Sequence, residues 1–354
     1  MTAMHIDRSP VALGLVATLL AVLSAGSAPA PAAAMAPAAG VAGPGAGVAA
    51  DCTRTHTGRV PLTDLGTGTY LGKQGGLYPG GVNTRPAAHD QAGVDLATNA
   101  VIPRNAAGQP DAVAGKVVLL SIGLSNTTQE FQRFIQVAAG VPGRDPHLAI
   151  VDGAQGGQDA VAWSTPGSPT WTVAAQRLTA AGVTPQQVQV VWLKQQIAGD
   201  ALGTFPAGAQ TLRDRLRDIV TIARAKYPNL RIVHLSSRTY GDYNGPTRGK
   251  GAYEQAFAVK LLIANQIAGD PQLDYTGADA VAPWLAWGPY LWADGLGSDG
   301  VPGGVPGRSD GLEYACGDFV TDGIHPSASG RDKVATALVT FYTSDSTAVP
   351  WFLA

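Results

Sequence analysis

The stretch from Lys116 to Glu130 reads KVVLLSIGLSNTTQE, and it decides the fold class. Its first half, residues 117–122, is an almost unbroken apolar run, which is typical of a strand buried on both faces of a sheet. Gly123 ends the run, and residues 129–139 then carry apolar side chains at helical spacing. The stretch therefore predicts a buried strand, a sharp turn and an amphipathic helix.

The same alternation of strand and helix continues to the C-terminus. Further strands are expected at residues 148–151, 188–193, 232–235 and 281–285, and further helices at 171–181, 209–227, 253–268 and 327–342. Strands that alternate with helices specify a parallel sheet with helices on both faces. Such sheets bind ligands at the carboxyl ends of their strands, so we expect a site in the loops that follow the strands.

The chain before this region divides into three segments. Residues 1–34 are an expected signal peptide, because the apolar run at 11–23 is shorter than the roughly 20 residues that span a membrane. An uncleaved N-terminal anchor is the alternative. Residues 35–50, almost only Ala, Pro, Gly and Val, are an expected flexible tether. Residues 51–115 are turn-rich without a long hydrophobic period, and we expect an N-terminal extension packed on a main domain at 116–354.

The composition excludes some classes of partner. The 354 residues include 24 Lys and Arg and 26 Asp and Glu, a net charge of −2, and they contain no basic run. Nucleic acid is therefore not an expected partner. No stretch after the leader is long and apolar enough to cross a bilayer, so we expect a secreted, extracellular protein with no membrane partner after signal cleavage.

Cys52 and Cys316 are the two cysteines of the chain. In the oxidising compartment that export implies, two cysteines most economically form one disulfide, and two unpaired thiols are the alternative. The bond would join the start of the extension to the segment just before Asp322.

Three of the loops carry unusual residues. Ser125 lies at the turn after the first strand, where a serine can expose its hydroxyl, but capping of the next helix explains Ser125 or Thr127 equally well. Gly156-Gly157 follows the second strand and can present an unhindered backbone N–H, with a tight turn as the alternative. Lys194 and Gln195 end the third strand and either enter the same crevice or lie in a surface turn.

A carboxylate precedes an imidazole by three residues in Asp322-Gly323-Ile324-His325, just before the last expected helix. On a loop, such a carboxylate can accept a hydrogen bond from Nδ1 and leave Nε2 free as a base. The alternative is an Asp-Gly turn before a helix that begins with proline. A serine, an aspartate and a histidine at one edge of the sheet together favour nucleophilic catalysis.

These loops resemble the four sequence blocks of the SGNH, or GDSL-like, serine hydrolases, over about residues 117–342. Gly123-Leu124-Ser125 looks like the family's Gly-Asp-Ser turn, and residues 322–325 match its Asp-x-x-His block. Gly157 matches the glycine whose amide donates to the oxyanion, and residues 192–195 fall where the family has Gly-x-Asn-Asp. The sequence departs from the family in two places, because Leu124 replaces the usual Asp and no Asn stands in the third block.

The resemblance implies a three-layer α/β/α fold with a parallel, flavodoxin-like sheet. It implies a catalytic triad of Ser125 as nucleophile, His325 as base and Asp322 as the residue that orients the base. The amides of Ser125 and Gly157 would form the oxyanion hole. Either Lys194 or Gln195 would complete it, and we favour Gln195 because a lysine cation disfavours the imidazolium that catalysis creates. No cofactor and no metal are implied.

The substrate is the least determined part of the sequence. Trp284 and Trp287 are candidate substrate-binding aromatics, with core aromatics as the alternative, and Arg238 is a candidate partner for a substrate carboxylate or for an internal one. The sequence thus predicts a secreted serine esterase that acts on acylated carbohydrate or short-chain acyl esters, small or polymeric. The alternatives are a catalytically weakened carbohydrate-binding module of the same fold, and a metal-dependent phosphoesterase that uses Asp152, Asp322 and His325.

Overall fold

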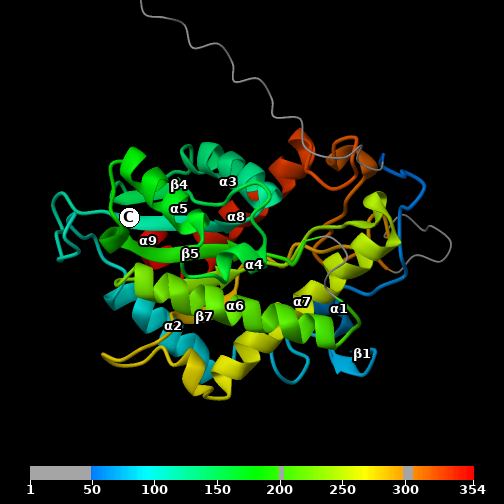
Figure 1. Ribbon diagram of the computed structural model, residues 1–354, viewed down its shortest axis with the longest axis horizontal. Coiled ribbons are helices and arrows are strands. Elements are labelled where there is room, and N and C mark those ends of the chain that lie inside the picture. The colour runs from blue at the N-terminus through cyan, green and yellow to red at the C-terminus, as the bar shows by residue number, and fades with distance from the viewer. Residues whose placement is uncertain (1–48, 199–202, 298–305) are drawn as a thin grey trace, which may run out of the picture. The chain divides into compact units, whose positions relative to one another are not determined.

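Five parallel strands form the sheet that the sequence predicts (Figure 1). They are β3 (Val117–Gly123), β4 (Leu148–Asp152), β5 (Val188–Lys194), β6 (Ile232–Leu235) and β7 (Trp284–Trp287). Their order across the sheet is β4-β3-β5-β6-β7, and every neighbouring pair is parallel. Counted along the chain, this is the 2-1-3-4-5 order of flavodoxin-like folds, so the predicted fold class is confirmed.

The computed structural model describes residues 49–198, 203–297 and 306–354. The described residues belong to one compact unit. The expected signal peptide, 1–34, and all but the last two residues of the expected tether lie outside them.

Helices cover both faces of the sheet, and Figure 1 shows β5 between α3 and α6. One face carries α2 (Ala87–Asn99), α3 (Ser125–Ala138), α8 (Ala328–Ser344) and α9 (Val349–Phe352); the other carries α4 (Ala160–Trp163), α5 (Pro169–Ala180), α6 (Ala207–Lys226) and α7 (Pro246–Ile267). The smaller elements are α1 (Leu62–Leu65), the antiparallel pair β1 (Thr69–Tyr70) and β2 (Lys73–Gln74), and the 3-10 helices Pro185–Gln187, Asp242–Asn244, Pro271–Leu273 and Cys316–Asp318.

Alternate side chains of β3 enter two different cores. Val118, Leu120 and Ile122 belong to the core that α4, α5, α6 and α7 cover, whereas Val117 and Leu119 belong to the core that α3 and α8 cover. All five are buried, because successive side chains of a strand point to opposite faces and both faces are covered. This is why the strand reads as a continuous apolar run.

The helices begin at residues that suit a first turn. Ser168 and Ser327 accept hydrogen bonds from the backbone N–H groups of Thr170 and Gly330, at 3.4 and 3.5 Å, and so cap α5 and α8. Pro246 opens α7 seven residues before the expected start at 253, since proline is well suited to the first helical turn.

Besides the short α1, the turn-rich extension contains a helix of 13 residues that the sequence pattern does not predict. This helix is α2, and its buried residues are His89, Gly93 and Ala97, so it leaves no strong hydrophobic period. Gly93 is needed there because a Cβ at this position would lie 2.3 Å from the ring of Trp284. Close packing against β7, rather than hydrophobic spacing, fixes this helix.

The start of the extension contacts the last loops of the domain. Cys52 and Cys316 form the expected disulfide, with their Cα atoms 5.4 Å apart. The backbone N–H groups of Thr57 and Gly58 both donate to the carboxylate of Asp294. These contacts hold residues 52–58 against loops that follow them by more than two hundred positions.

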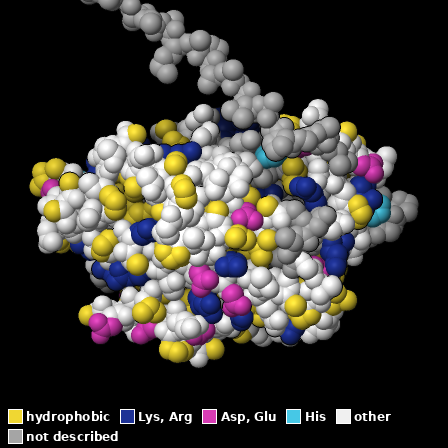
Figure 2. All heavy atoms as spheres, viewed as in Figure 1, with side chains coloured by type: hydrophobic (Ala, Val, Ile, Leu, Met, Phe, Trp, Pro, Cys, Tyr) yellow, Lys and Arg dark blue, Asp and Glu magenta, His cyan; other side chains and the backbone are white. Residues whose placement is uncertain are grey.

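The surface carries charges of both signs. On the face drawn in Figure 2, basic and acidic side chains are interspersed over the described residues. Among the described helices, none combines the length and the apolar character that a bilayer crossing requires.

Candidate active site

The turn after β3 places Ser125 at the first position of α3. Gly123 is required before it, because a Cβ there would lie 2.3 Å from Thr127 Oγ1 and 2.5 Å from the carbonyl oxygen of Lys194. Leu124 is extended, with φ −92° and ψ −165°, and the helix starts directly after it. The backbone N–H of Ser125 therefore belongs to the unpaired first turn, at the positive end of the helix dipole.

Ser125, His325 and Asp322 are joined by hydrogen bonds. Ser125 Oγ lies 2.8 Å from His325 Nε2, and His325 Nδ1 lies 2.6 Å from Asp322 Oδ2. In the tautomer that carries its hydrogen on Nδ1, the ring donates to Asp322 and Nε2 accepts from the serine hydroxyl. The structure thus brings the three residues together across 200 positions of sequence, and it does not use Ser125 Oγ to cap α3.

Asp322 is held as a carboxylate. Partial burial by itself raises the pKa of this group, but the bond to the His325 ring and the bonds from two backbone N–H groups lower it more, so the pKa lies below its usual 3.8. Both backbone bonds go to Oδ1, at 2.9 Å, from the N–H groups of Ile324 and His325. One oxygen therefore fixes the loop while the other holds the ring.

The loop that carries the pair has its own supports. Asn244 Nδ2 donates to the carbonyl oxygen of Asp322 at 2.6 Å. The backbone N–H of Ala50 donates to the carbonyl oxygen of Thr321 at 2.8 Å. Gly323 has φ +67°, and a Cβ there would lie 2.7 Å from the backbone of Tyr243. The Asp-Gly dipeptide thus forms the turn that the sequence offered as an alternative to a catalytic pair. In the structure, the same turn also positions the His325 ring.

The glycine pair after β4 lies beside the serine. A Cβ on Gly156 would be 3.9 Å from Ser125 Cβ, and Gly157 has φ +73°. Both glycines are exposed. The backbone N–H of Gly157 donates no hydrogen bond to any of the described residues. An unbonded backbone N–H in an exposed loop is the kind of donor that an oxyanion hole uses.

Lys194 does not lie in the site crevice. Its ammonium is fully buried and donates to both carboxylate oxygens of Glu130, at 2.6 Å to Oε1 and in a shorter contact to Oε2. Burial lowers the pKa of this ammonium to about 8, against the opposing effect of Glu130. The sequence could not reveal this ion pair, because its members are 64 positions apart.

Gln195 is also bonded within the protein. Its Nε2 donates to the carbonyl oxygen of Gln158 at 3.1 Å, and its Oε1 accepts from the N–H of Gln196 at 3.0 Å. Of the two candidates for the third oxyanion donor, Gln195 is the one that no carboxylate holds, and its Nε2 carries a second N–H.

The two candidate tryptophans require a correction. Trp284 is buried against α2, with its Nε1 donating to the carbonyl oxygen of His89 at 3.0 Å. Trp287 is buried in the opposite core, with its Nε1 donating to the carbonyl oxygen of Leu77 at 2.8 Å. They are core aromatics, because β7 is covered on both faces, and neither is available to stack on a substrate.

Asn126, which the sequence does not single out, and Arg238, which it does, both lie near the candidate site. Asn126 Nδ2 donates to the carbonyl oxygen of Ile324 at 2.6 Å, which links the serine turn to the histidine loop. Arg238, the candidate that follows β6, is buried beside a small cavity and has no hydrogen-bond partner for its Nε and Nη1.

Asp152 does not join Asp322 and His325 as the metal-site alternative requires. Asp152 accepts hydrogen bonds from Ser121 at 2.7 Å and from Thr128, and it pairs with Arg177 at 3.4 Å. Within residues 49–198, 203–297 and 306–354, no group of three His, Cys, Asp or Glu side chains is placed to hold an ion.

Comparisons with known proteins give structural neighbours only. No family model and no curated protein matches the chain. Among solved structures, the chain is similar to a protein from Slackia heliotrinireducens that is provisionally assigned to the SGNH hydrolases, with 14% identity, a TM-score of 0.34, and coverage of 64% of this chain and 99% of that one. It is also similar to a provisionally assigned acylhydrolase from Bacteroides fragilis, with 13% identity, a TM-score of 0.34, and coverage of 73% and 97%. A protein from Arabidopsis thaliana has 13% identity, a TM-score of 0.33, and coverage of 61% and 67%.

Proposed function

We propose that the protein is a secreted serine esterase that hydrolyses carboxylic esters through Ser125, His325 and Asp322. The observation that carries the proposal is the continuous hydrogen-bond chain from Ser125 Oγ through the His325 ring to Asp322, at 2.8 and 2.6 Å. These three hydrogen-bonded residues lie at the carboxyl edge of a parallel sheet, which is where such folds bind their ligands. The four sequence blocks that resemble those of the SGNH hydrolases support the same assignment.

In the proposed reaction, Ser125 Oγ attacks the ester carbonyl and passes its proton to His325 Nε2. The tetrahedral intermediate collapses, the alcohol leaves with that proton, and the acyl group remains on Ser125. Water then attacks the acyl-serine with His325 again as base, which releases the acid and restores the hydroxyl. Asp322 stays ionised throughout and stabilises the imidazolium.

Backbone amides are the proposed main donors to the oxyanion. The N–H of Ser125 lies in the open first turn of α3, and Gly157 is an exposed residue next to Gly156, which adjoins Ser125. One such donor contributes about 3 kcal/mol to the barrier. Gln195 is the proposed third donor, since Lys194 is bound to Glu130 beneath the crevice.

Short acyl esters and acylated carbohydrate remain the proposed substrates. Export is supported by the apolar run at 11–23 and by the Cys52–Cys316 disulfide, because such bonds persist in oxidising compartments.

The direct test is reaction with a fluorophosphonate probe and with 4-nitrophenyl acetate, each with and without chelator. A serine esterase is labelled at Ser125 and hydrolyses the ester in both conditions. A binding module does neither, and a metal-dependent phosphoesterase is not labelled at Ser125 and loses with the chelator any hydrolysis that it shows.

A further inference from the structure

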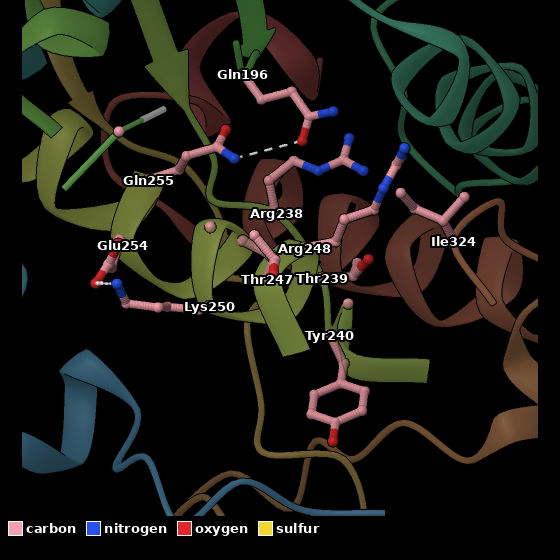
Figure 3. A pocket seen from close by; sticks show the side chains of 14 residues that line it. Gln196, Arg238, Thr239, Tyr240, Thr247, Arg248, Lys250, Glu254, Gln255 and Ile324 are labelled. Carbon is pink, nitrogen blue, oxygen red and sulfur yellow. Dashed lines mark hydrogen bonds and ion pairs between the residues drawn. The ribbon is translucent and has the colours of Figure 1, made fainter. Parts of the chain in front are cut away.

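A small cavity adjoins the candidate site at the carboxyl end of β6. Its volume is about 70 Å³, and its walls include Arg238 and Thr239 from the loop after β6, Arg248 from α7, and Ile324. Ile324 directly precedes His325, so the cavity and the proposed base share one loop. Figure 3 shows the guanidinium groups of Arg238 and Arg248 turned to the same side, close to Ile324.

Arg238 lacks the partners that a buried guanidinium requires. The residue is 4% exposed, and its Nε and Nη1 atoms are buried with no hydrogen-bond partner. Unpaired buried donors are costly, and a charged one more so, because the group has lost water and gained nothing in return. Burial accordingly lowers the pKa of the guanidinium.

The neighbouring carboxylates are already engaged. The negative charge of Glu130 attracts the Arg238 guanidinium without a hydrogen bond between them. Both carboxylate oxygens of Glu130 bond Lys194, so two buried cations share one buried anion. Glu254, on the cavity wall, accepts from the Tyr70 hydroxyl at 2.8 Å and pairs with Lys250 at 3.5 Å. The cavity therefore keeps an uncompensated positive charge at its floor.

Arg248 adds a second cation at the rim. Its side chain is exposed, and no described residue forms a hydrogen bond or an ion pair with it. A guanidinium presents its donors in a planar fork that matches the two oxygens of a carboxylate. The volume is about five times what one water needs, which suits a group of a few heavy atoms and not a whole sugar ring.

We propose that this cavity is a carboxylate subsite of the candidate active site, with Arg238 as its floor and Arg248 as its rim. Under the esterase function on which this inference rests, the preferred substrates are esters that carry a free carboxylate near the scissile bond. The carboxylate belongs either to the acyl group, as in half-esters of dicarboxylic acids, or to the alcohol, as in esters of hydroxy acids.

The kinetic test uses matched pairs of aryl and alkyl esters, one member with the carboxylate and the other with its neutral amide. One arm places the carboxylate on the acyl side and the other on the alcohol side. The measured quantity is the ratio of kcat/KM for the anionic ester to that for the neutral ester. We expect a ratio of at least about ten in one arm, falling with added salt because the rim charge is screened.

Three variants locate the effect. Arg238→Gln should lower the ratio by about tenfold or more, and Arg248→Gln by about threefold. Lys73→Gln, which removes an exposed cation that does not line the cavity, is the matched control and should change the ratio less than twofold. Circular dichroism checks folding, and if Arg238→Gln does not fold, the Arg248→Gln variant and the salt series decide.

A binding test separates this inference from the esterase function. Calorimetry of the Ser125→Ala variant with glutarate, glutaramide and inorganic phosphate should show binding of glutarate alone, abolished by adding Arg238→Gln. If the unmodified protein hydrolysed no ester while the Ser125→Ala variant still bound glutarate, the esterase would be refuted and the subsite would stand. An active esterase with a ratio near one in both arms, or a site that prefers phosphate, overturns the subsite.

Discussion

The side-chain amide of Asn126 donates a hydrogen bond of 2.6 Å to the carbonyl oxygen of Ile324. Asn126 follows the proposed nucleophile and Ile324 precedes the proposed base, so this bond joins the two halves of the site next to the reacting atoms. Asn126 is buried, and the bond is therefore protected from competing water.

Asn126→Ala is expected to lower kcat about tenfold with little change in KM. The bond is worth about 1 kcal/mol, and its loss lets the serine turn and the histidine loop drift apart. The rate of fluorophosphonate labelling should fall in parallel, which a general loss of stability would not produce at temperatures well below Tm. A kcat equal to that of the unmodified protein would show that the loops hold their geometry without this bond.

Ser125→Ala is expected to abolish ester hydrolysis and probe labelling while Tm stays within a few degrees. The hydroxyl contributes little packing, since the side chain is only half-buried and its one bond goes to His325. The matched control is Thr128→Ala, which removes another hydroxyl from the first turn of the same helix, one that is bonded to Asp152. Turnover near the unmodified level in Ser125→Ala would eliminate the proposed mechanism.

Asp322→Asn should lower kcat by about 10⁴-fold, as expected when the base loses the carboxylate that sets its tautomer. The pH dependence of stability gives a second readout. Because the pKa of Asp322 in the folded state lies below 3.8, its contribution is present above that pH and is lost as the pH falls through the lowered value. The difference in Tm between the unmodified protein and Asp322→Asn should therefore be steady from about pH 5 to 7 and shrink below about 3.8. A difference that grows on acidification would contradict the lowered pKa.

Lys194→Met should mainly reduce stability, by about 3–5 kcal/mol, because it leaves the Glu130 carboxylate buried without its partner. Adding Glu130→Leu should restore much of that loss, which denaturant unfolding of the single and double variants measures. Gln195→Ala serves as the comparison and should cost about 10² in kcat with a smaller effect on stability. If Lys194→Met instead lost about 10² in kcat at unchanged stability, Lys194 would be the oxyanion donor.

Reduction of Cys52–Cys316 should lower Tm. The disulfide closes a loop of 264 positions. In the chain-entropy model, such a bond raises the free energy of unfolding by about 5 kcal/mol at most. Mass spectrometry under non-reducing conditions should find the two cysteines in one linked peptide pair. Two free thiols in exported protein would contradict the bond, and a Cys52→Ser/Cys316→Ser variant with unchanged Tm would contradict its contribution.

The sheet and the serine, aspartate and histidine loops are recognisable in sequence because their signals are local. An apolar run such as that of β3 and a spacing such as that of Asp322 and His325 each lie within a few residues. What the sequence misses depends on contacts between distant segments. The helix α2 is fixed by the fit of Gly93 to Trp284, and the state of Lys194 by Glu130, so neither leaves a pattern that can be read along the chain.

The loop that holds Asp322 and His325 is fastened to the first described residues, through the bond from Ala50 to Thr321 and the disulfide at Cys52. During biosynthesis the ribosome makes Ser125 200 residues before His325, so the proposed nucleophile and the proposed base cannot meet until that intervening segment has been made. A protease that removed residues 50–52 afterwards would release one support of the base without touching the sheet. The proposed activity should therefore depend both on synthesis of the loop that holds Asp322 and His325 and on the integrity of residues 50–52.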